Sequence, residues 1–598
     1  MNTEGVGSRL RSVVPWCAVG AVLAWYLAPL WRNPTYWAGT FDWGYFFFLQ
    51  EVSRKTVLEY GQFPRWNPYY CGGAVHLANP QTFFSSLTFI PVLIFGTPIG
   101  MRIMVTAAIV LAFDSMRQWS RARGLSAEGA MLAGTGYAIC GALAYQLGGG
   151  HVGWFGFALF PYVLLCFERA LDGSSGRGRS GWIAGAALLM AWIAGHWGVY
   201  QYPYICMLLA VYGLLLGVQR RRVKPALGIV AALVAVSVAL AAFRILPLVE
   251  FIREHPRTIL DEAVFYPWEW WDVYVERHPN RRFWGARHYQ WPEYANYFGP
   301  VGTALFFVGA VVVVRWRREQ WPALVTLGLF ALLTLGNIPG APWWWLRKLP
   351  FFDALRVPSR FTIIVGMMMC LCIGLAVDHL ARWARARGNW TPWALGAVAL
   401  VVAAYVVDVA QFNRRQWTQS FTTPPPTDVV SPDFHNVSGI ASAMYRFPRV
   451  NRGSLSCFEE SPLPISPALN AHLGIDDQER PADPTVGSVK RVRWTPNRIA
   501  LHVDFDAPGR VVVNQNHDRH WRASVGRVVS DRGRLAVDVP AGARALELVY
   551  WPRSLTLGLA ISGLGFAGLI AMLVAARTGL GIDGSSFEKE ASNLRSNR

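Results

Sequence analysis

The sequence predicts a mainly α-helical, polytopic transmembrane bundle of about 12 spans, with a small extracytoplasmic β-domain before the last span. Hydrophobic residues make up 53% of the chain and charged residues 16%, and the mean hydropathy of +0.25 argues against an ordinary water-soluble surface. Apolar runs of about 17–25 residues recur, each long enough to cross the hydrocarbon core as a helix. Arg and Lys cluster in the short loops between these runs, so we interpret the net charge of +19 as membrane topology and not as nucleic-acid binding.

Apolar periodicity gives the position of each predicted span. The spans lie near residues 12–31, 98–114, 127–147, 153–170, 181–195, 199–217, 225–247, 299–314, 322–337, 361–381, 391–410 and 554–576. The first run lacks a convincing small-x-small cleavage site, so we expect a retained span and not a signal peptide. A shorter run, residues 82–96, contains Pro91 and is expected to be re-entrant or interfacial, although a crossing there stays open.

The positive-inside rule sets the predicted orientation. With a cytoplasmic N-terminus, every short cytoplasmic loop is basic, and the opposite orientation would put all of these clusters outside. The clusters lie at residues 117–123, 177–179, 220–224, 315–318 and 382–387. We therefore expect a multi-pass protein of the bacterial cytoplasmic (inner) membrane, with both termini cytoplasmic and its active site on the outer face.

The expected domains follow from this topology and from local composition. They are a transmembrane core (1–411) with external loops 32–97, 248–298 and 338–360, an irregular extracytoplasmic linker (412–486), a β-domain (487–553), a final transmembrane helix (554–576) and a cytoplasmic tail (577–598). Alternating patterns predict strands around 498–505, 509–513 and 534–539, and Asp531-Arg532-Gly533 predicts a turn between two strands.

Six of the eight cysteines lie within apolar runs and are expected to be buried filler: Cys17, Cys140, Cys166, Cys206, Cys370 and Cys372. Only Cys71 and Cys457 fall in segments predicted to be external. Whether these two form a disulfide stays open.

The first external loop contains the strongest catalytic candidate. Asp42 follows the first span among aromatic residues, where a carboxylate could act as a base, orient an acceptor or bind a metal. The alternative is a carboxylate that only caps the following helix. His76 and Asn79, farther along the same loop, are candidates for contacts with a sugar or acceptor, and Arg65 is a candidate for phosphate binding.

The other external segments add aromatic and basic candidates. Trp291 and Glu293 belong to a stretch dense in Trp, Tyr and Arg that suits carbohydrate, although aromatic belts also mark membrane interfaces. Guanidinium groups outside the membrane suit a lipid phosphate, or are snorkelling anchors. These arginines are Arg253, Arg257, Arg356 and Arg360. We interpret His151 and His196, at the outer ends of spans, as hydrogen-bonded helix caps.

Several strings together resemble the YfhO family of bacterial membrane proteins, which belongs with the GT-C glycosyltransferases. They include FPRWNPYYCGGAVHLANPQTFF, LGGGHVGWFGFALFPYVLLCFERAL, EYANYFGP, LGNIPGAPWWWLRKLPFFDALRVPSRF and, near the C-terminus, NQNHDRHWRASV and VPAGARALELVYWP. The resemblance implies a GT-C fold in which the first external loop supplies an essential acid, and Asp42 corresponds to that acid. Trp43 follows Asp42 where related mannosyltransferases have a second acid, so metal use cannot be carried over.

The predicted function is therefore transfer of a sugar from a polyprenyl-phosphate donor to an extracytoplasmic acceptor, namely a cell-envelope polymer, glycolipid or protein. Asp42 is the expected base. The arginines are the expected phosphate ligands, and no cofactor is expected with certainty, with a divalent metal left open. The alternative function is a non-catalytic transporter or flippase of envelope lipids, or an assembly factor. A transporter is expected to have paired broken helices and mid-membrane polar groups, of which the sequence offers few.

Overall fold

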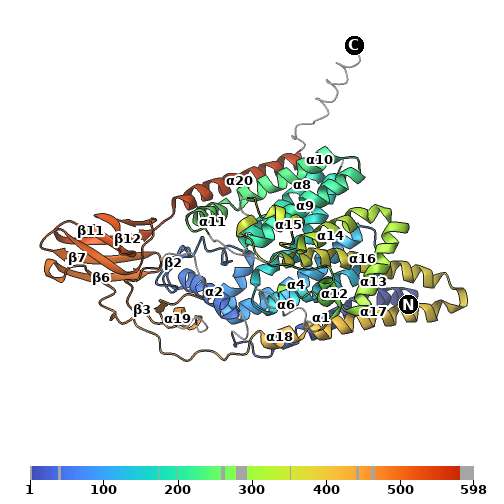
Figure 1. Ribbon diagram of the computed structural model, residues 1–598, viewed down its shortest axis with the longest axis horizontal. Helices are drawn as coiled ribbons and strands as arrows, with labels where there is room; N and C mark the ends of the chain where they lie inside the picture. Colours follow the sequence, from blue (N-terminus) through green and yellow to red (C-terminus); the bar gives the residue numbers. More distant parts are fainter. Residues whose placement is uncertain are drawn as a thin grey trace, which may run out of the picture.

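The chain is a multi-pass membrane protein whose helices form an elongated bundle with a β-domain at one end (Figure 1). The computed structural model describes residues 3–37, 42–173, 176–196, 198–256, 263–277, 293–349, 352–439, 444–458 and 465–578. Figure 1 shows β6, β7, β11 and β12 at one end of the long axis, while α13 and α17 extend toward the other.

Within these ranges, eight helical stretches are long and apolar enough to cross a membrane. They contain α1 (Thr3–Leu27), α4 (Thr97–Ala122), η3 (Val152–Leu159) with α7 (Phe160–Asp172), α9 (Gly198–Gln219), α10 (Val223–Leu240), α16 (Thr362–Arg385), α17 (Thr391–Asn413) and α20 (Arg553–Thr578). A ninth is counted if α13 (Gly299–Arg315) and α14 (Trp321–Thr334), which meet at an angle of 112°, form one span. The prediction of a polytopic helical bundle is therefore confirmed, whereas the predicted number of about 12 spans is not, because eight or nine are found among the described residues.

The remaining predicted spans are helical but do not meet this test. α5 (Ala127–Ile139) has 13 residues and is separated from α6 (Gly141–Gly148) by Cys140, whose backbone is extended. α8 (Gly176–Gly195) has 20 residues but is not among the stretches that are apolar enough to cross a membrane. The predicted span at 225–247 corresponds to α10, which meets the test but ends at Leu240, and the separate helix α11 (Ala242–Glu254) follows Ala241. The run at 82–96 forms a short turn, η2 (Leu87–Phe89), and the six-residue helix α3 (Ile90–Phe95), which is too short to cross a bilayer.

α16 is the central helix of the bundle, and an 18-residue stretch of its span is completely buried. It packs against α5, α13, α14 and α17. At its N-terminal end the 3-10 turn η8 (Pro358–Phe361) places Arg360 in the protein interior. In contrast, the spans of α1, α17 and α20 are only 28%, 17% and 11% buried, as expected for helices that face lipid.

The β-domain contains two four-stranded sheets. Their strand orders are β10-β11-β8-β5 and β6-β7-β12-β9. The strands are β5 (Glu479–Pro481), β6 (Gly487–Thr495), β7 (Arg498–Phe505), β8 (Gly509–Asn516), β9 (Trp521–Ala523), β10 (Arg527–Asp531), β11 (Arg534–Val539) and β12 (Gly542–Tyr550). The three predicted strands are present, and Asp531 pairs with Arg534 across the predicted turn. Because β5 pairs with β8, this sheet begins before the expected domain start at residue 487.

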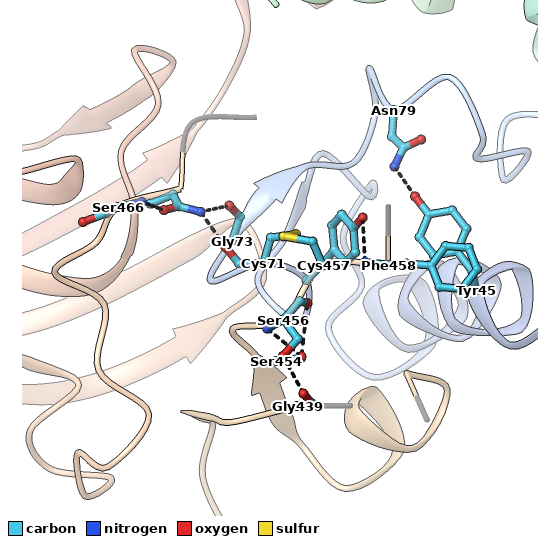
Figure 2. Close-up of a disulfide and its surroundings, with 12 residues drawn as sticks. Tyr45, Cys71, Gly73, Asn79, Gly439, Ser454, Ser456, Cys457, Phe458 and Ser466 are labelled. Carbon is cyan, nitrogen blue, oxygen red and sulfur yellow. Dashed lines mark hydrogen bonds between the residues drawn. A yellow bond between two sulfur atoms is a disulfide. The ribbon is translucent and has the colours of Figure 1, made fainter. Parts of the chain in front are cut away.

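The first external loop is attached to the C-terminal part of the chain. It contains the two-stranded sheet of β1 (Trp66–Asn67) and β2 (Ala74–Val75), and the side chain of Asn516 donates hydrogen bonds to the carbonyls of Cys71 and Gly73. Cys71 and Cys457 form a disulfide, which answers the question left open by the sequence (Figure 2).

Two further strands and five short helices lie in the described part of the chain. A parallel pair, β3 (His435–Val437) with β4 (Arg452–Ser454), lies in the expected linker, so that region is only partly irregular. The shorter helices are α2 (Trp43–Leu58), α12 (Glu269–Val275), α15 (Pro342–Leu346), α18 (Arg415–Gln419) and α19 (Arg446–Arg449).

Candidate active site

Asp42 precedes α2, and a glycine-rich loop packs against it. The backbone N–H of Asp42 donates to the carbonyl of Gly149 at 3.0 Å, and the indole of Trp43 donates to Gly148 at 2.7 Å. Gly150 has a φ of +101°, and a Cβ there would lie 2.7 Å from the backbone nitrogen of Trp43. Glycine is therefore needed where this loop turns against the start of α2.

The side chain of Asp42 makes no capping hydrogen bond to α2. Its Oδ2 instead lies 2.8 Å from Nε2 of His151, the residue that follows the glycines. The alternative that the carboxylate of Asp42 caps the following helix is therefore wrong. The helix-cap interpretation of His151 fails for the same reason, because its ring contacts Asp42 and Gln146 and caps no helix with its side chain.

The hydrogen bonds of Gln146 fix how protons are shared in this pair. Its Nε2 donates to Oε2 of Glu293 at 3.1 Å, so its Oε1 faces Nδ1 of His151 and accepts from it. Because Nδ1 then carries a hydrogen, Nε2 either accepts from a protonated Asp42 or donates to an ionised one. An ionised Asp42 is therefore paired with His151 as an imidazolium.

Glu293 continues the network to Arg360. The two carboxylate oxygens of Glu293 accept from Nε and Nη2 of Arg360 at 2.9 and 2.5 Å, a bidentate ion pair. The Arg360 guanidinium also lies 4.5 Å from the centre of the Tyr200 ring. Burial raises the pKa of Glu293, but the charges of Arg360 and then His151 outweigh this and lower it to about 2. Glu293 is therefore ionised at neutral pH.

Exposure falls along this network from Asp42 to Arg360. The side chain of Asp42 is 28% exposed and that of His151 17%, whereas Glu293 is 14% and Arg360 6% exposed. An incoming hydroxyl can therefore reach the carboxylate of Asp42. Arg360 lies behind Glu293 with little surface of its own.

The structure separates the other first-loop candidates from this network. Arg65 stacks on Trp551, 4.4 Å from the ring centre, next to the β-domain. His76 is fully buried, and Ser53 lies 2.7 Å from its Nε2, so its ring has no surface to offer a sugar. Asn79 donates to the hydroxyl of Tyr45 at 3.1 Å, and Tyr45 stacks on Phe458 beside the disulfide (Figure 2).

The remaining candidates have different surroundings. Arg356 is half-buried and precedes η8, while Arg253 is exposed near the end of α11. Arg257 and Trp291 lie outside the described residues. Of the predicted site residues, Asp42, Glu293 and Arg360 are joined into one network, through His151 and Gln146.

Sequence reasoning missed Gln146 and Tyr200 and gave His151 a structural role. The available signal was the string GGGH directly after a predicted span, since glycines allow close backbone approach and place the following histidine. Nothing in the local sequence of Gln146 or Tyr200 distinguishes them from ordinary bundle residues.

A possible metal group lies elsewhere in the described part of the chain. Glu250, Glu254 and His520 have ligand atoms within 4.8 Å of one another, between α11 and the β-domain. Arg519 forms ion pairs with both glutamates and supplies one positive charge to them, so the set fits a structural contact better than a metal ion. This group does not include Asp42.

Comparisons with known proteins give partial structural likenesses. No protein-family model matches the chain, so the resemblance to the YfhO family is not confirmed, and no curated protein matches it. The apo oligosaccharyltransferase of Archaeoglobus fulgidus is similar with a TM-score of 0.45 and 14% identity, covering 73% of this chain and 64% of that chain. The chain thus spans less than two thirds of the length of the archaeal enzyme.

Two further structures are similar at the same level. ArnT from Cupriavidus metallidurans in the apo state has a TM-score of 0.44 and 12% identity, covering 75% of this chain and 86% of that chain. The A. fulgidus enzyme AglB, in complex with an inhibitory peptide and a dolichol-phosphate, has a TM-score of 0.47 and 13% identity, covering 73% of this chain and 64% of that chain. Likenesses this weak support no inference about the activity of this chain.

Proposed function

We propose that the chain is a GT-C-type membrane glycosyltransferase of the YfhO kind, which moves a sugar from a polyprenyl-phosphate donor to an extracytoplasmic cell-envelope acceptor. The observation that carries the proposal is the carboxylate of Asp42. It is partly exposed, does not cap its helix and is held 2.8 Å from an imidazole. A positioned carboxylate of this kind suits general base catalysis.

The proposed reaction is an inverting displacement at the anomeric carbon. The acceptor hydroxyl oxygen forms a bond to this carbon on the face opposite the phosphate, and the carbon–oxygen bond to the phosphate breaks. The electron pair of that bond leaves with the polyprenyl phosphate, and the hydroxyl proton passes to Asp42. His151 orients Asp42, and the positive charge that the pair gains when Asp42 takes the proton lies near the ionised Glu293.

The proposed role of Arg360 changes from the expectation of direct phosphate binding. Two of its N–H groups are used by Glu293, and breaking a buried ion pair is costly. We assign Arg360 to holding Glu293, which in turn orients Gln146 and His151. Arg356, and Arg253 on α11, remain the proposed ligands of the donor phosphate.

The test compares envelopes and purified protein carrying Asp42 or Asp42→Asn. Envelope glycans of cells with and without the gene are compared first, and labelled polyprenyl-phosphate hexoses then serve as donors in membranes. Asp42→Asn is expected to lower transfer about 10²- to 10⁴-fold with normal membrane abundance, because the amide keeps the shape but cannot accept a proton. Asp428→Asn, which removes an external carboxylate paired with Arg446, is the matched control and is expected to stay active.

Two outcomes would contradict the proposal. Near-normal transfer by Asp42→Asn removes Asp42 from catalysis. Identical envelope glycans with and without the gene, together with altered export of an envelope lipid, would instead favour the transporter or assembly function.

A further inference from the structure

A cavity that contains no residue of the Asp42 network lies between helices of the bundle. Its volume is about 990 Å³, and α1, α5, α16 and α17 form its walls. The walls are apolar along most of their length, with Val19, Val22, Met131, Leu132, Val398 and Val402 among the lining residues. Such a volume is in the range of ligand sites, and its apolar walls suit a hydrocarbon chain.

One end of the cavity is basic. Its lining contains four arginines and two acidic side chains, an excess of two positive charges. These residues are Arg121, Arg317, Arg382, Arg385, Glu128 and Asp378. The arginines come from segments that the positive-inside pattern predicts to be cytoplasmic.

The acidic side chains at this end do not cancel the whole positive charge. Both carboxylate oxygens of Asp378 accept from Ser126, at 2.7 Å from its backbone N–H and 2.5 Å from its hydroxyl. Arg317 is paired with Glu319. Arg382 and Arg385 are exposed, and no ion pair within 4 Å involves them among the residues that the structure describes. The Nε of Arg382 donates to the backbone carbonyl of Asp378, and Arg385 and Arg121 act electrostatically on Glu128 from a longer distance. Two guanidinium groups can thus meet an anion here.

The two outer walls face the bilayer. The spans of α1 and α17 are only 28% and 17% buried, so the cavity lies between lipid-facing helices and the buried helix α16. A hydrocarbon-lined space with a basic rim at one membrane surface matches a lipid with an anionic head group. Free phosphate would satisfy the rim but leave the apolar walls empty.

We propose that this cavity binds one anionic phospholipid of the cytoplasmic leaflet, with an acyl chain between α1, α5, α16 and α17 and its phosphate at Arg382 and Arg385. The site is independent of the proposed transferase reaction, because it shares no residue with the Asp42 network. The bound lipid should also stabilise the folded chain whether or not the chain is a transferase, because a ligand that binds only the folded state stabilises that state.

The proposal is tested by native mass spectrometry of the purified full chain in detergent, titrated with phosphatidylglycerol or phosphatidylcholine. One tightly retained phosphatidylglycerol is expected. Arg382→Gln/Arg385→Gln is expected to weaken retention at least about tenfold, given the contribution of each basic residue to the attraction of anionic lipid. The control Arg221→Gln/Lys224→Gln changes two exposed basic residues of another predicted cytoplasmic loop and is expected to have no effect.

A second variant tests the acyl-chain slot without touching charge. Val402→Trp fills the apolar wall and is expected to reduce phosphatidylglycerol retention while leaving membrane abundance and the thermal unfolding temperature of the lipid-free protein near normal. Inorganic phosphate at millimolar concentration is expected not to displace the lipid. Equal retention of phosphatidylcholine, or unchanged retention in both the double arginine variant and Val402→Trp, would overturn the proposal.

Discussion

Nε2 of His151 lies 2.8 Å from Oδ2 of Asp42, although 109 residues separate them in the chain. Because Gln146 fixes the other ring nitrogen, His151 can hold Asp42 in one orientation. The contact makes His151 a positioning residue for the proposed base, and its effect should be separable from that of Asp42.

We expect His151→Asn to lower kcat roughly 10- to 100-fold with little change in the KM for the donor, because the base is mispositioned but donor binding is untouched. The pH–rate profile should also shift, which a purely structural role would not cause. The double variant with Asp42→Asn should be no slower than Asp42→Asn alone. Additive losses would show that His151 acts independently of Asp42.

Arg360→Lys is expected to lower the thermal unfolding temperature and kcat together, because lysine cannot make both hydrogen bonds to Glu293. Arg356→Lys should instead raise the KM for the donor with normal stability. The control is Arg491→Lys in the β-domain, where Arg491 forms a similar two-point pair with Glu479, and this variant should lose stability but not turnover. A donor-KM effect confined to Arg360→Lys would restore Arg360 as a phosphate ligand.

Thiol labelling should find six reactive cysteines in the denatured, unreduced chain and eight after reduction, since Cys71 and Cys457 are bonded. Cys457→Ser is expected to destabilise the external region by about 2–4 kcal/mol, measured by limited proteolysis in detergent. Cys17→Ser, which removes an exposed free thiol, should behave like the parent protein. Eight reactive thiols before reduction would contradict the pairing.

Stability should fall as the pH drops from about 6.5 toward 5. Burial, with a further contribution from Arg244, lowers the pKa of His76 to about 3, and burial lowers that of His196 to about 4 despite a hydrogen bond to the Val152 carbonyl. Below the unfolded pKa of about 6.5, only the unfolded state gains these protons, so each histidine costs about 1.4 kcal/mol per pH unit until its folded pKa is reached.

The pH dependence can be assigned by substitution. His76→Asn should roughly halve the slope of unfolding temperature against pH in this window, whereas the exposed His472→Asn should leave it unchanged. Glu293 does not contribute here, because its lowered pKa means that its stabilisation is lost only as pH falls from about 4.5 to about 2. An unchanged slope in His76→Asn would show that His76 is protonated in the folded chain.

Reporter fusions after residues 120, 176, 222, 317 and 386 are expected to report the cytoplasm, and fusions near 270, 350 and 480 the outside. The disulfide agrees with an external location of residues 71 and 457, because disulfides persist in oxidising compartments. A consistent inversion after residue 97 would mean that α3 and its flanks cross the membrane after all.

Patterns local in sequence predicted their elements well. The alternation at 498–505 and 534–539 gave β7 and β11, because the period of a strand is set by neighbours two residues apart. The same local logic overcounted spans, because hydropathy does not reveal that the backbone becomes extended at Cys140 or that α13 and α14 meet at 112°.

Sequence reasoning identified residues of the candidate network where the residue type and its position beside a predicted span both suggested a function. Asp42 and Arg360 stand beside spans, and both joined the network. Glu293 was predicted as a sugar or acceptor contact, but its ion pair with Arg360, 67 residues away, could not be predicted. The contact of His151 with Asp42 could not be predicted either, because it depends on a turn that only the folded bundle creates. Direct phosphate binding by Arg360 was inferred without knowing that a buried carboxylate already occupies its planar fork.

The bond between Cys71 and Cys457 also sets an order of events during biosynthesis. Its two sulfur atoms are 386 residues apart, so the loop after Asp42 emerges from the ribosome long before its partner exists. Most of the bundle must be inserted before that loop is secured. Fixing of the first external loop is therefore coupled to export and oxidation of a late segment, and a chain truncated before residue 457 would be expected to reach the membrane without the covalent bond that holds this loop.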